Sequence, residues 1–348
     1  MNTMLKNLGK TLVPNMLPEE LFDVNLHSDT VRDLFFKYVR HVEIENHNYC
    51  NRVCWFCPNS LIDRRSTTIL MRDQIFNKII DDLKSINYAQ GLLWTRYHEP
   101  LAHSLFFKRV KHARAQLPKA SLVAYSNGDF LNRGTLTLLE DAGLDRLHIS
   151  LYLPRGKERN HAALERALEN LSTRVGLSIT QTSSEYILTK SSIYVTVRNH
   201  SFLPEKGADH VSTRAGMINL PGTTTYQRYA TCYLPLHSVN IDYNGTCVLC
   251  CHTLSDAPEH NGAVVGDLRD EGYSLFDFYR ELAPFRAALL SPKPRTGVCR
   301  KCNVGDTPFC RFTRRPPWCK LPRLVPGLSK FFEIMLACYI RNRSKDFG

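Results

Sequence analysis

Residues 47–59 read HNYCNRVCWFCPN, and this stretch decides how the rest of the chain is interpreted. Cys50, Cys54 and Cys57 are separated by three and then two residues, so one short loop can bind three irons of a cubane iron-sulfur cluster. The neighbouring sequence has no fourth cysteine, which leaves one iron open to a small chelating ligand. His47 and the three cysteines also form a Cys3His set, so a zinc site remains an alternative on these residues alone.

Length and composition are those of a globular protein. The chain has 348 residues, 43% hydrophobic and 22% charged, enough for one large domain and a smaller one. The first 20 residues lack an export signal, and apolar runs elsewhere fall short of the roughly 20 residues that span a bilayer. We therefore expect a cytoplasmic protein without a membrane span, whose 12 cysteines bind metal rather than form disulfides.

The net charge of +12 is concentrated at the C-terminal end. Residues 291–348 contain 13 Lys or Arg and 3 Asp or Glu. Such a segment can face nucleic acid, an anionic substrate or a membrane surface. It can also offset the negative charge of cluster thiolates, and we favour this second interpretation.

Up to residue 200 the chain alternates short apolar strands with helices. The expected strands lie at 39–46, 91–96, 121–126, 146–153 and 191–198, and the expected helices at 30–38, 72–87, 103–116, 133–142 and 161–173. Repeated strand-helix units predict parallel strands with right-handed crossovers. About six units favour an α/β fold with a partial (β/α)6 TIM-like barrel, whose sites gather at the C-terminal ends of the strands.

Polar motifs follow three of these strands. Tyr97-His98-Glu99-Pro100 follows the second strand, Ser126-Asn127-Gly128 the third, and Ser150 lies near the end of the fourth. In this order after the cysteine loop, the motifs resemble those of the radical S-adenosylmethionine (radical SAM) superfamily. Tyr97 and His98 replace the two glycines of the family's Gly-Gly-Glu-Pro segment.

The resemblance implies a cofactor set and its ligands. Cys50, Cys54 and Cys57 would hold a [4Fe-4S] cluster whose open iron chelates SAM, and Glu99 would face the SAM ammonium group. The residues implied in SAM binding are Phe56, His98, Glu99, Ser126, Asn127 and Ser150. For His98, a packed and hydrogen-bonded role is the alternative.

The second half of the chain contains another set of cysteines. Residues 239–243 and 247–249 predict two short strands joined by the turn Asn244-Gly245, followed by one helix at 274–290. Cys232, Cys250, Cys299 and Cys302 surround these elements in the sequence. Their arrangement resembles the SPASM or twitch extension of radical SAM enzymes, which implies an auxiliary [4Fe-4S] cluster on these four cysteines. A structural four-cysteine zinc site is the alternative.

The expected domain organisation follows from these motifs. We expect an N-terminal extension at 1–38, the partial barrel at 39–215, the auxiliary-cluster domain at 216–320, and a basic connector with a terminal helix at 321–348. Cys310 and Cys319 follow the auxiliary cysteines at wider intervals, and their role stays open.

The resemblance also implies an activity. The chain would cleave SAM reductively and abstract a hydrogen atom from a carbon of a peptide or small metabolite, leading to oxidation, epimerisation or bond formation. An epimerase returns a hydrogen atom from a thiol, for which Cys247 and Cys251 are candidates. The alternative is a core position for Cys247 and a ligand role for Cys251. Expected partners are the substrate and a reductant such as flavodoxin or ferredoxin, without nucleic acid. The competing hypothesis is a non-catalytic zinc protein that contacts nucleic acid through its basic end.

Overall fold

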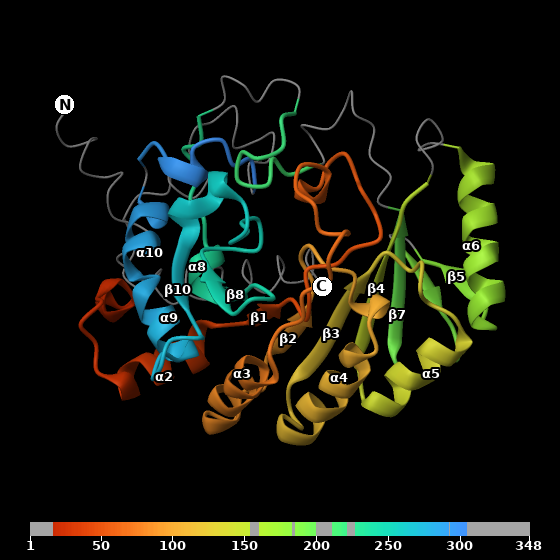
Figure 1. The fold of residues 1–348 in the computed structure, drawn as a ribbon, viewed down its shortest axis with the longest axis horizontal. Coiled ribbons are helices and arrows are strands. Elements are labelled where there is room, and N and C mark those ends of the chain that lie inside the picture. Colours follow the sequence, from red (N-terminus) through yellow and green to blue (C-terminus); the bar gives the residue numbers. More distant parts are fainter. Residues whose placement is uncertain are drawn as a thin grey trace, which may run out of the picture.

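The computed structural model describes residues 17–153, 160–182, 185–199, 211–220, 227–291 and 293–304. Its centre is one open, curved sheet in the order β10-β9-β8-β1-β2-β3-β4-β7-β6-β5 (Figure 1). The sheet is not closed, and with its helices it forms the partial barrel that the sequence predicts. The terminal helix expected at 329–341, together with Cys310, Cys319 and Cys338, lies outside the described residues.

Six neighbouring strands of the sheet are parallel. In spatial order they are β8 (Ser238–Ile241), β1 (His41–Ile44), β2 (Gly91–Trp94), β3 (Ser121–Ser126), β4 (Arg146–Leu151) and β7 (Tyr194–Asn199). β8 comes from the second half of the sequence, so the expected hairpin extends the barrel sheet instead of standing apart. The register places Glu43 beside Asn240 on one side and Leu93 on the other.

Antiparallel strands extend both edges of the sheet. β9 (Thr246–Val248) and β10 (Val264–Asp267) follow β8, while β6 (Tyr186–Leu188) and β5 (Ile179–Gln181) follow β7. The hairpin between β8 and β9 turns at Gly245, whose φ of +92° is the left-handed conformation that glycine adopts readily. The Asn-Gly turn signal is confirmed, whereas the sequence analysis did not predict β5, β6 or β10.

The long helices pack outside the sheet. They are α2 (Ser28–Tyr38), α3 (Asp73–Ser85), α4 (Leu105–Gln116), α5 (Arg133–Ala142) and α6 (His161–Val175). A short α8 (Leu234–His237) precedes β8, and α9 (Leu275–Glu281) lies beside α2, as Figure 1 also shows. The five helices predicted in the first half are confirmed within two residues, because each has buried apolar residues at helical spacing.

The single helix expected at 274–290 is wrong. The chain forms α9 and then a separate α10 (Ala283–Leu290), with Leu282 between them. Pro284 lies in the first turn of α10, where its missing N–H costs nothing, but inside a continuous helix it would break a hydrogen bond and clash with the preceding turn. Apolar residues keep helical spacing on both sides of this break, so the sequence pattern did not reveal it.

Strand alternation separates an apolar core from a polar inner wall. Val42, Ile44, Leu92 and Trp94 face the helices and belong to the main core, as do their counterparts on the other parallel strands. The residues between them point to the concave side of the sheet. Several of these inward residues are polar and buried: Glu43, Glu45, His148, Thr196 and Asn240. The fold therefore builds a polar interior under the strand ends.

Candidate active site

The cysteine loop follows β1 and is closed by hydrogen bonds at its base. Asn48 donates to Thr67 O (3.0 Å) and accepts from the Ile69 amide (2.8 Å), while His47 forms a bridge with Leu70. These contacts join the two ends of a loop of about twenty residues. His47 is thus part of the loop's base, and its pKa is lowered to about 4, mainly by burial.

The three thiols of the loop lie close enough to perturb one another. The Cys57 amide donates to Cys54 O at 2.9 Å, which makes a tight turn between the last two cysteines. The pKa of Cys50 is raised to about 12 and that of Cys54 to about 11, mainly by burial, and neighbouring cysteines contribute to both rises. Thiolates grouped in this way are stable only beside a cation, so the donor set fits an iron-sulfur cluster.

A chain of polar contacts connects the cysteine loop to the end of β3. Asp129 accepts from Asn51 Nδ2 (2.7 Å) and from Arg52 Nε and Nη2 (2.7 and 2.6 Å). Asn127 Nδ2 in turn donates to Asn51 Oδ1 at 2.7 Å. The loop and the third strand end, predicted separately from the sequence, are therefore brought together.

Glu99 lies at the centre of this site. Its carboxylate accepts from Ser126 Oγ and the Asn127 amide, both at 2.7 Å, and from the Leu101 amide at 3.1 Å. Burial nevertheless raises its pKa to about 7, against the effect of these donors. Hydrogen bonds alone do not offset the lost hydration, so the site fits a bound cation such as the SAM ammonium group.

The remaining predicted SAM-binding residues occupy different positions. Phe56 is buried, with its ring 5.6 Å from that of Tyr152, and Ser150 hydrogen-bonds with Tyr152. His98 is buried too, with Nδ1 3.0 Å from Thr95 O and Nε2 accepting from the Asn46 amide at 3.4 Å. Burial holds the pKa of His98 well below its usual value. Both ring nitrogens are thus used within the protein, as in the alternative role considered for His98.

The four auxiliary cysteines also come together. Cys232, Cys299 and Cys302 each raise the pKa of the Cys250 thiol, although burial is the largest cause. The Cys302 amide donates to Cys299 O at 3.3 Å, so this pair forms a turn like that of the first loop. The four cysteines thus form one neighbourhood built from α8, β9 and η7 (Gly297–Cys299) and the segments that flank them.

Arg228 supplies positive charge to this second cysteine group. Its buried guanidinium donates to Cys302 Sγ at 3.4 Å and to Cys302 O at 3.1 Å. Its other hydrogen bonds go to the backbone carbonyls of Ala230 and Thr231. A buried arginine that interacts with three of these thiols, those of Cys232, Cys299 and Cys302, fits an anionic cluster in this position.

The two remaining hairpin cysteines differ in their surroundings. Cys247 is fully buried in the main core. Burial raises the pKa of its thiol well above the ordinary value, and Asp267, Asp242 and Glu281 contribute to the rise. Cys251 lies on the inner side, where its thiol interacts with Glu43 and Arg96. Of the two, only Cys251 is near the polar interior.

Among the described residues, no three His, Cys, Asp or Glu side chains stand close enough to hold a single metal ion.

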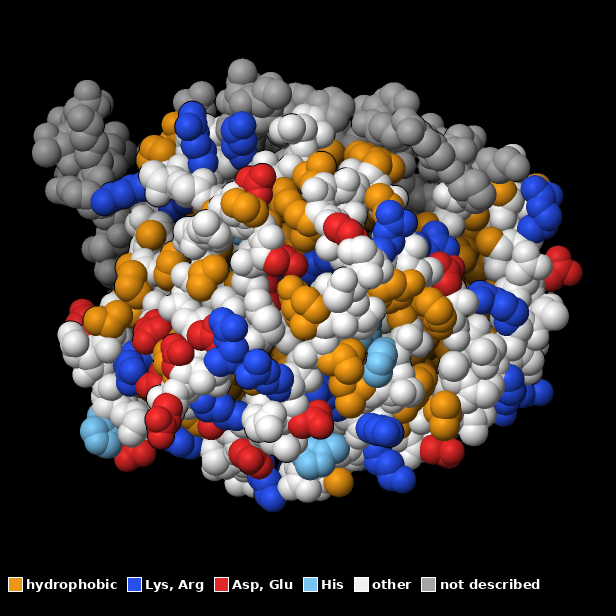
Figure 2. All heavy atoms as spheres, viewed as in Figure 1, with side chains coloured by type: hydrophobic (Ala, Val, Ile, Leu, Met, Phe, Trp, Pro, Cys, Tyr) orange, Lys and Arg blue, Asp and Glu red, His pale blue; other side chains and the backbone are white. Residues whose placement is uncertain are grey.

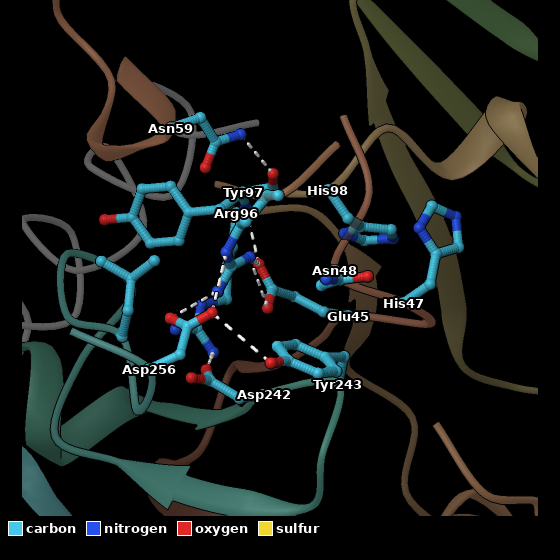
Figure 3. A network of polar contacts seen from close by, with 12 residues as sticks. Glu45, His47, Asn48, Asn59, Arg96, Tyr97, His98, Asp242, Tyr243 and Asp256 are labelled. Atoms are coloured by element: carbon cyan, nitrogen blue, oxygen red, sulfur yellow. Dashed lines mark hydrogen bonds and ion pairs between the residues drawn. The ribbon is translucent and has the colours of Figure 1, made fainter. Parts of the chain in front are cut away.

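Sequence reasoning missed a group of charges that joins the end of β1 to the second half of the chain; all are buried except Asp256, whose side chain is 25% exposed. Arg64 pairs with Glu45 and Asp256, and Arg96 pairs with Asp242. Figure 3 shows Glu45, Arg96, Asp242 and Asp256 pointing toward one another. Each is an ordinary charged residue in the sequence, and the partners are up to 192 positions apart. The only available signal was the placement of Glu43 and Glu45 on alternate positions of an otherwise buried strand.

Sequence reasoning also missed the role of residues 211–220. A glycine and the lack of apolar periodicity in this segment predicted a domain boundary there. Val211, Ile218 and Leu220 pack on Phe56 of the cysteine loop. Arg214 lies 5.8 Å from the Tyr97 ring, and its charge lowers the pKa of Cys57 against the larger effect of burial. This segment therefore covers the cluster loop.

Comparison with known proteins assigns the fold and the site to a class. The family model of the radical SAM superfamily matches residues 45–189, and that of the SPASM iron-sulfur cluster-binding domain matches residues 232–303. The chain belongs to the radical SAM superfamily, carries an SPASM-type extension, and is an enzyme whose cofactors are SAM and iron-sulfur clusters. This membership replaces the hypothesis of a non-catalytic zinc protein.

Individual known proteins resemble this chain in sequence or in fold. The chain is 30% identical over 109 residues to the S-adenosyl-L-methionine-dependent 2-deoxy-scyllo-inosamine dehydrogenase of Niallia circulans, an alignment that covers 31% of this chain and 43% of that relative. The crystal structure of BtrN in complex with AdoMet and 2-DOIA superposes with a TM-score of 0.57 at 21% identity, covering 77% of this chain and 94% of BtrN. BtrN in an open conformation gives a TM-score of 0.51 at 18% identity and the same coverage. The two structural matches show a common fold.

Proposed function

We propose that this enzyme oxidises a hydroxyl-bearing carbon of a small polar metabolite in a SAM-dependent reaction. The sequence predicted a peptide as the other possible substrate class. It also left epimerisation and bond formation open as other outcomes of hydrogen abstraction. The partial match to a dehydrogenase of an aminocyclitol supports the small-metabolite class. The observation that carries the proposal is the polar inner wall of the barrel.

The inner wall offers hydrogen-bonding groups that the protein leaves unused. His148 Nε2 and Asn240 Oδ1 are buried and, among the described residues, have no hydrogen-bond partner. His148 Nδ1 is 2.6 Å from Thr196 Oγ1, and its ring stacks on Tyr125 at 4.8 Å. Because an unpaired buried polar atom costs about 1–3 kcal/mol, a ligand rich in hydroxyl groups would gain by satisfying both.

Glu43 is suited to take the proton of the reacting hydroxyl group. It accepts from Ser238 Oγ at 3.1 Å on the inner face of β1. Burial raises its pKa to about 6, while Arg96 and Ser238 oppose the rise. A carboxylate with a pKa near neutrality is effective as a general base. When bound, SAM and its cluster supply the radical that removes the hydrogen atom from carbon, and the auxiliary cluster supplies a one-electron acceptor.

The test uses anaerobically reconstituted enzyme with SAM, dithionite and two substrate panels, one of cyclitols and amino sugars and one of short peptides. We expect 5'-deoxyadenosine and a product lighter by two hydrogens only with a member of the first panel. Deuterium placed on the reacting carbon should appear in 5'-deoxyadenosine. Turnover of peptides without turnover of any polyol would refute the proposal. A product that keeps the mass of the substrate in ordinary water, and gains one deuterium at the carbon in deuterated water, would instead indicate epimerisation.

A further inference from the structure

Arg64 joins the two halves of the molecule through two carboxylates. Its Nη1 lies 3.1 and 3.2 Å from the Glu45 carboxylate oxygens at the end of β1. Its Nε and Nη2 donate to Asp256 of the auxiliary domain at 3.1 and 3.0 Å. Arg64 is 1% exposed and Glu45 is fully buried. The planar guanidinium can address both carboxylates at once, which a lysine ammonium on a single stem cannot do with the same geometry.

Glu45 connects Arg64 to the segment that carries Glu99. Its Oε1 accepts from the Tyr97 amide at 2.8 Å, and the Tyr97 carbonyl accepts from Asn59 Nδ2, also at 2.8 Å (Figure 3). Both backbone groups of Tyr97 are thus fixed from the region of the cysteine loop. Two residues later, Glu99 makes the contacts that fit the SAM ammonium group.

Arg96 makes a second bridge beside the first. Its φ of +84° is a conformation that a residue with a side chain adopts at a cost. The side chain is fully buried, forms an ion pair with Asp242, and donates through Nη2 to Thr253 O at 2.5 Å. Both partners belong to the second half of the chain. The auxiliary domain therefore holds Arg96 in a conformation that sets the direction of the segment beginning at Tyr97.

We propose that Asp256 and Asp242, acting through Arg64 and Arg96, position the SAM-binding segment at Tyr97–Glu99, so that docking of the auxiliary domain is coupled to SAM affinity. Arg64 and Arg96 are buried, and a buried guanidinium that loses a carboxylate partner is strongly destabilised, so we expect the loss of either contact to shift the segment. The coupling concerns SAM binding alone and holds whichever substrate the enzyme oxidises.

The test measures the SAM dissociation constant of the full-length, reconstituted enzyme by equilibrium binding, with iron content and thermal unfolding measured on the same samples. Asp256→Asn keeps the side-chain shape and removes the charge, whereas Arg64→Met removes the other partner. We expect each variant to keep both clusters and to bind SAM roughly tenfold or more weakly. The double variant should be no weaker than the weaker single variant, because the two residues act as one unit.

The matched control breaks an ion pair of the same type in the same domain. Arg269 pairs with Asp267 on the surface, with Arg269 53% exposed, and Arg269→Met should leave SAM affinity unchanged. Unchanged affinity in Asp256→Asn with full iron content would overturn the proposal, as would effects of the two single variants that simply add. If Arg64→Met fails to load its clusters, Asp256→Asn and Asp242→Asn decide the question. Loss of polyol oxidation with SAM affinity intact would concern the proposed function only.

Discussion

At the scale of single residues, burial is the main determinant of chemistry in this protein. Glu43 and Glu99 both face the interior, and burial raises the pKa of each carboxyl above its ordinary value. Their partners differ: Glu99 accepts three hydrogen bonds from residues at the strand ends, whereas Glu43 accepts a hydrogen bond from Ser238 and lies near the Arg96 guanidinium. Glu99 is therefore suited to face a cation, whose charge would keep the carboxylate ionised despite a pKa of about 7, and Glu43, with a pKa of about 6, is suited to accept a proton.

Glu99→Gln should weaken SAM binding by about 1.5–3 kcal/mol, or roughly tenfold to a hundredfold. The amide removes the charge that faces the ammonium group and places a donor opposite the Asn127 amide. Iron content should remain at the unmutated level, since Glu99 is not a cluster ligand. Equilibrium binding of SAM together with iron analysis checks both expectations. Unchanged affinity would show that this segment only terminates a strand.

With SAM at saturating concentration, so that its ammonium group keeps Glu99 ionised, product formation should rise with pH through about 6 and then level off, because only the carboxylate form of Glu43 accepts a proton. Because the pKa of Glu43 is raised to about 6, this carboxyl group is mostly protonated below pH 6 and cannot act as a base there. Arg96, Ser238, Tyr125 and Cys251 surround it, and only Glu43 among them changes charge in this range. Single-turnover rates between pH 5 and 8, compared with Glu43→Gln, test the assignment. The same pH profile in both proteins would contradict it.

At the scale of elements, turns and breaks decide how the strands and helices meet. The β8–β9 hairpin depends on Gly245, where a Cβ would lie 2.8 Å from Ile75 Cδ1 on α3. The division between α9 and α10 depends on Pro284. Both features direct chain segments toward the auxiliary cysteines, because Cys250 follows the hairpin and Cys299 follows the second helix.

Gly245→Ala should lower the free energy of unfolding by about 1–2 kcal/mol, because it combines an unfavourable φ with a close contact. Gly262→Ala is the matched control, since its Cβ would meet nothing within 4 Å and its φ is not positive. Thermal or denaturant unfolding of the two variants measures the difference. Equal stability of both variants would contradict the role assigned to the hairpin turn.

At the scale of the whole molecule, one continuous sheet carries strands next to both cysteine sites, because β1 leads into the first cysteine loop and the β8–β9 hairpin lies between Cys232 and Cys250. On the face drawn in Figure 2, basic side chains of the described residues are interspersed with acidic ones, and the strongly basic segment 305–348 lies outside the described residues. No described helix is long and apolar enough to cross a membrane. A reductant such as flavodoxin or ferredoxin remains the proposed redox partner.

The enzyme should bind about eight irons per chain in two cubanes. Cys54→Ala should remove about half of them and abolish reductive SAM cleavage, since it takes a ligand from the SAM-binding cluster. Cys299→Ala should remove the other half and spare SAM cleavage. Iron and sulfide analysis with measurement of 5'-deoxyadenosine checks both variants. About four irons in the fully reconstituted unmutated protein would contradict the auxiliary cluster.

The sequence by itself determined the elements whose signals are local. Cysteine spacing, strand alternation, the Asn244-Gly245 turn and the polar strand ends each depend on residues a few positions apart, so they predicted the barrel, the loop and both cysteine sets. Only the tertiary structure decided that β8 completes the parallel sheet, that residues 211–220 cover the cluster loop, and that Arg64 pairs with Asp256 across 192 positions. These features are pairings of charged or apolar groups that are common anywhere in a sequence. Their partners are fixed by burial, because an interior charge is tolerated only where the fold brings its counter-charge to it.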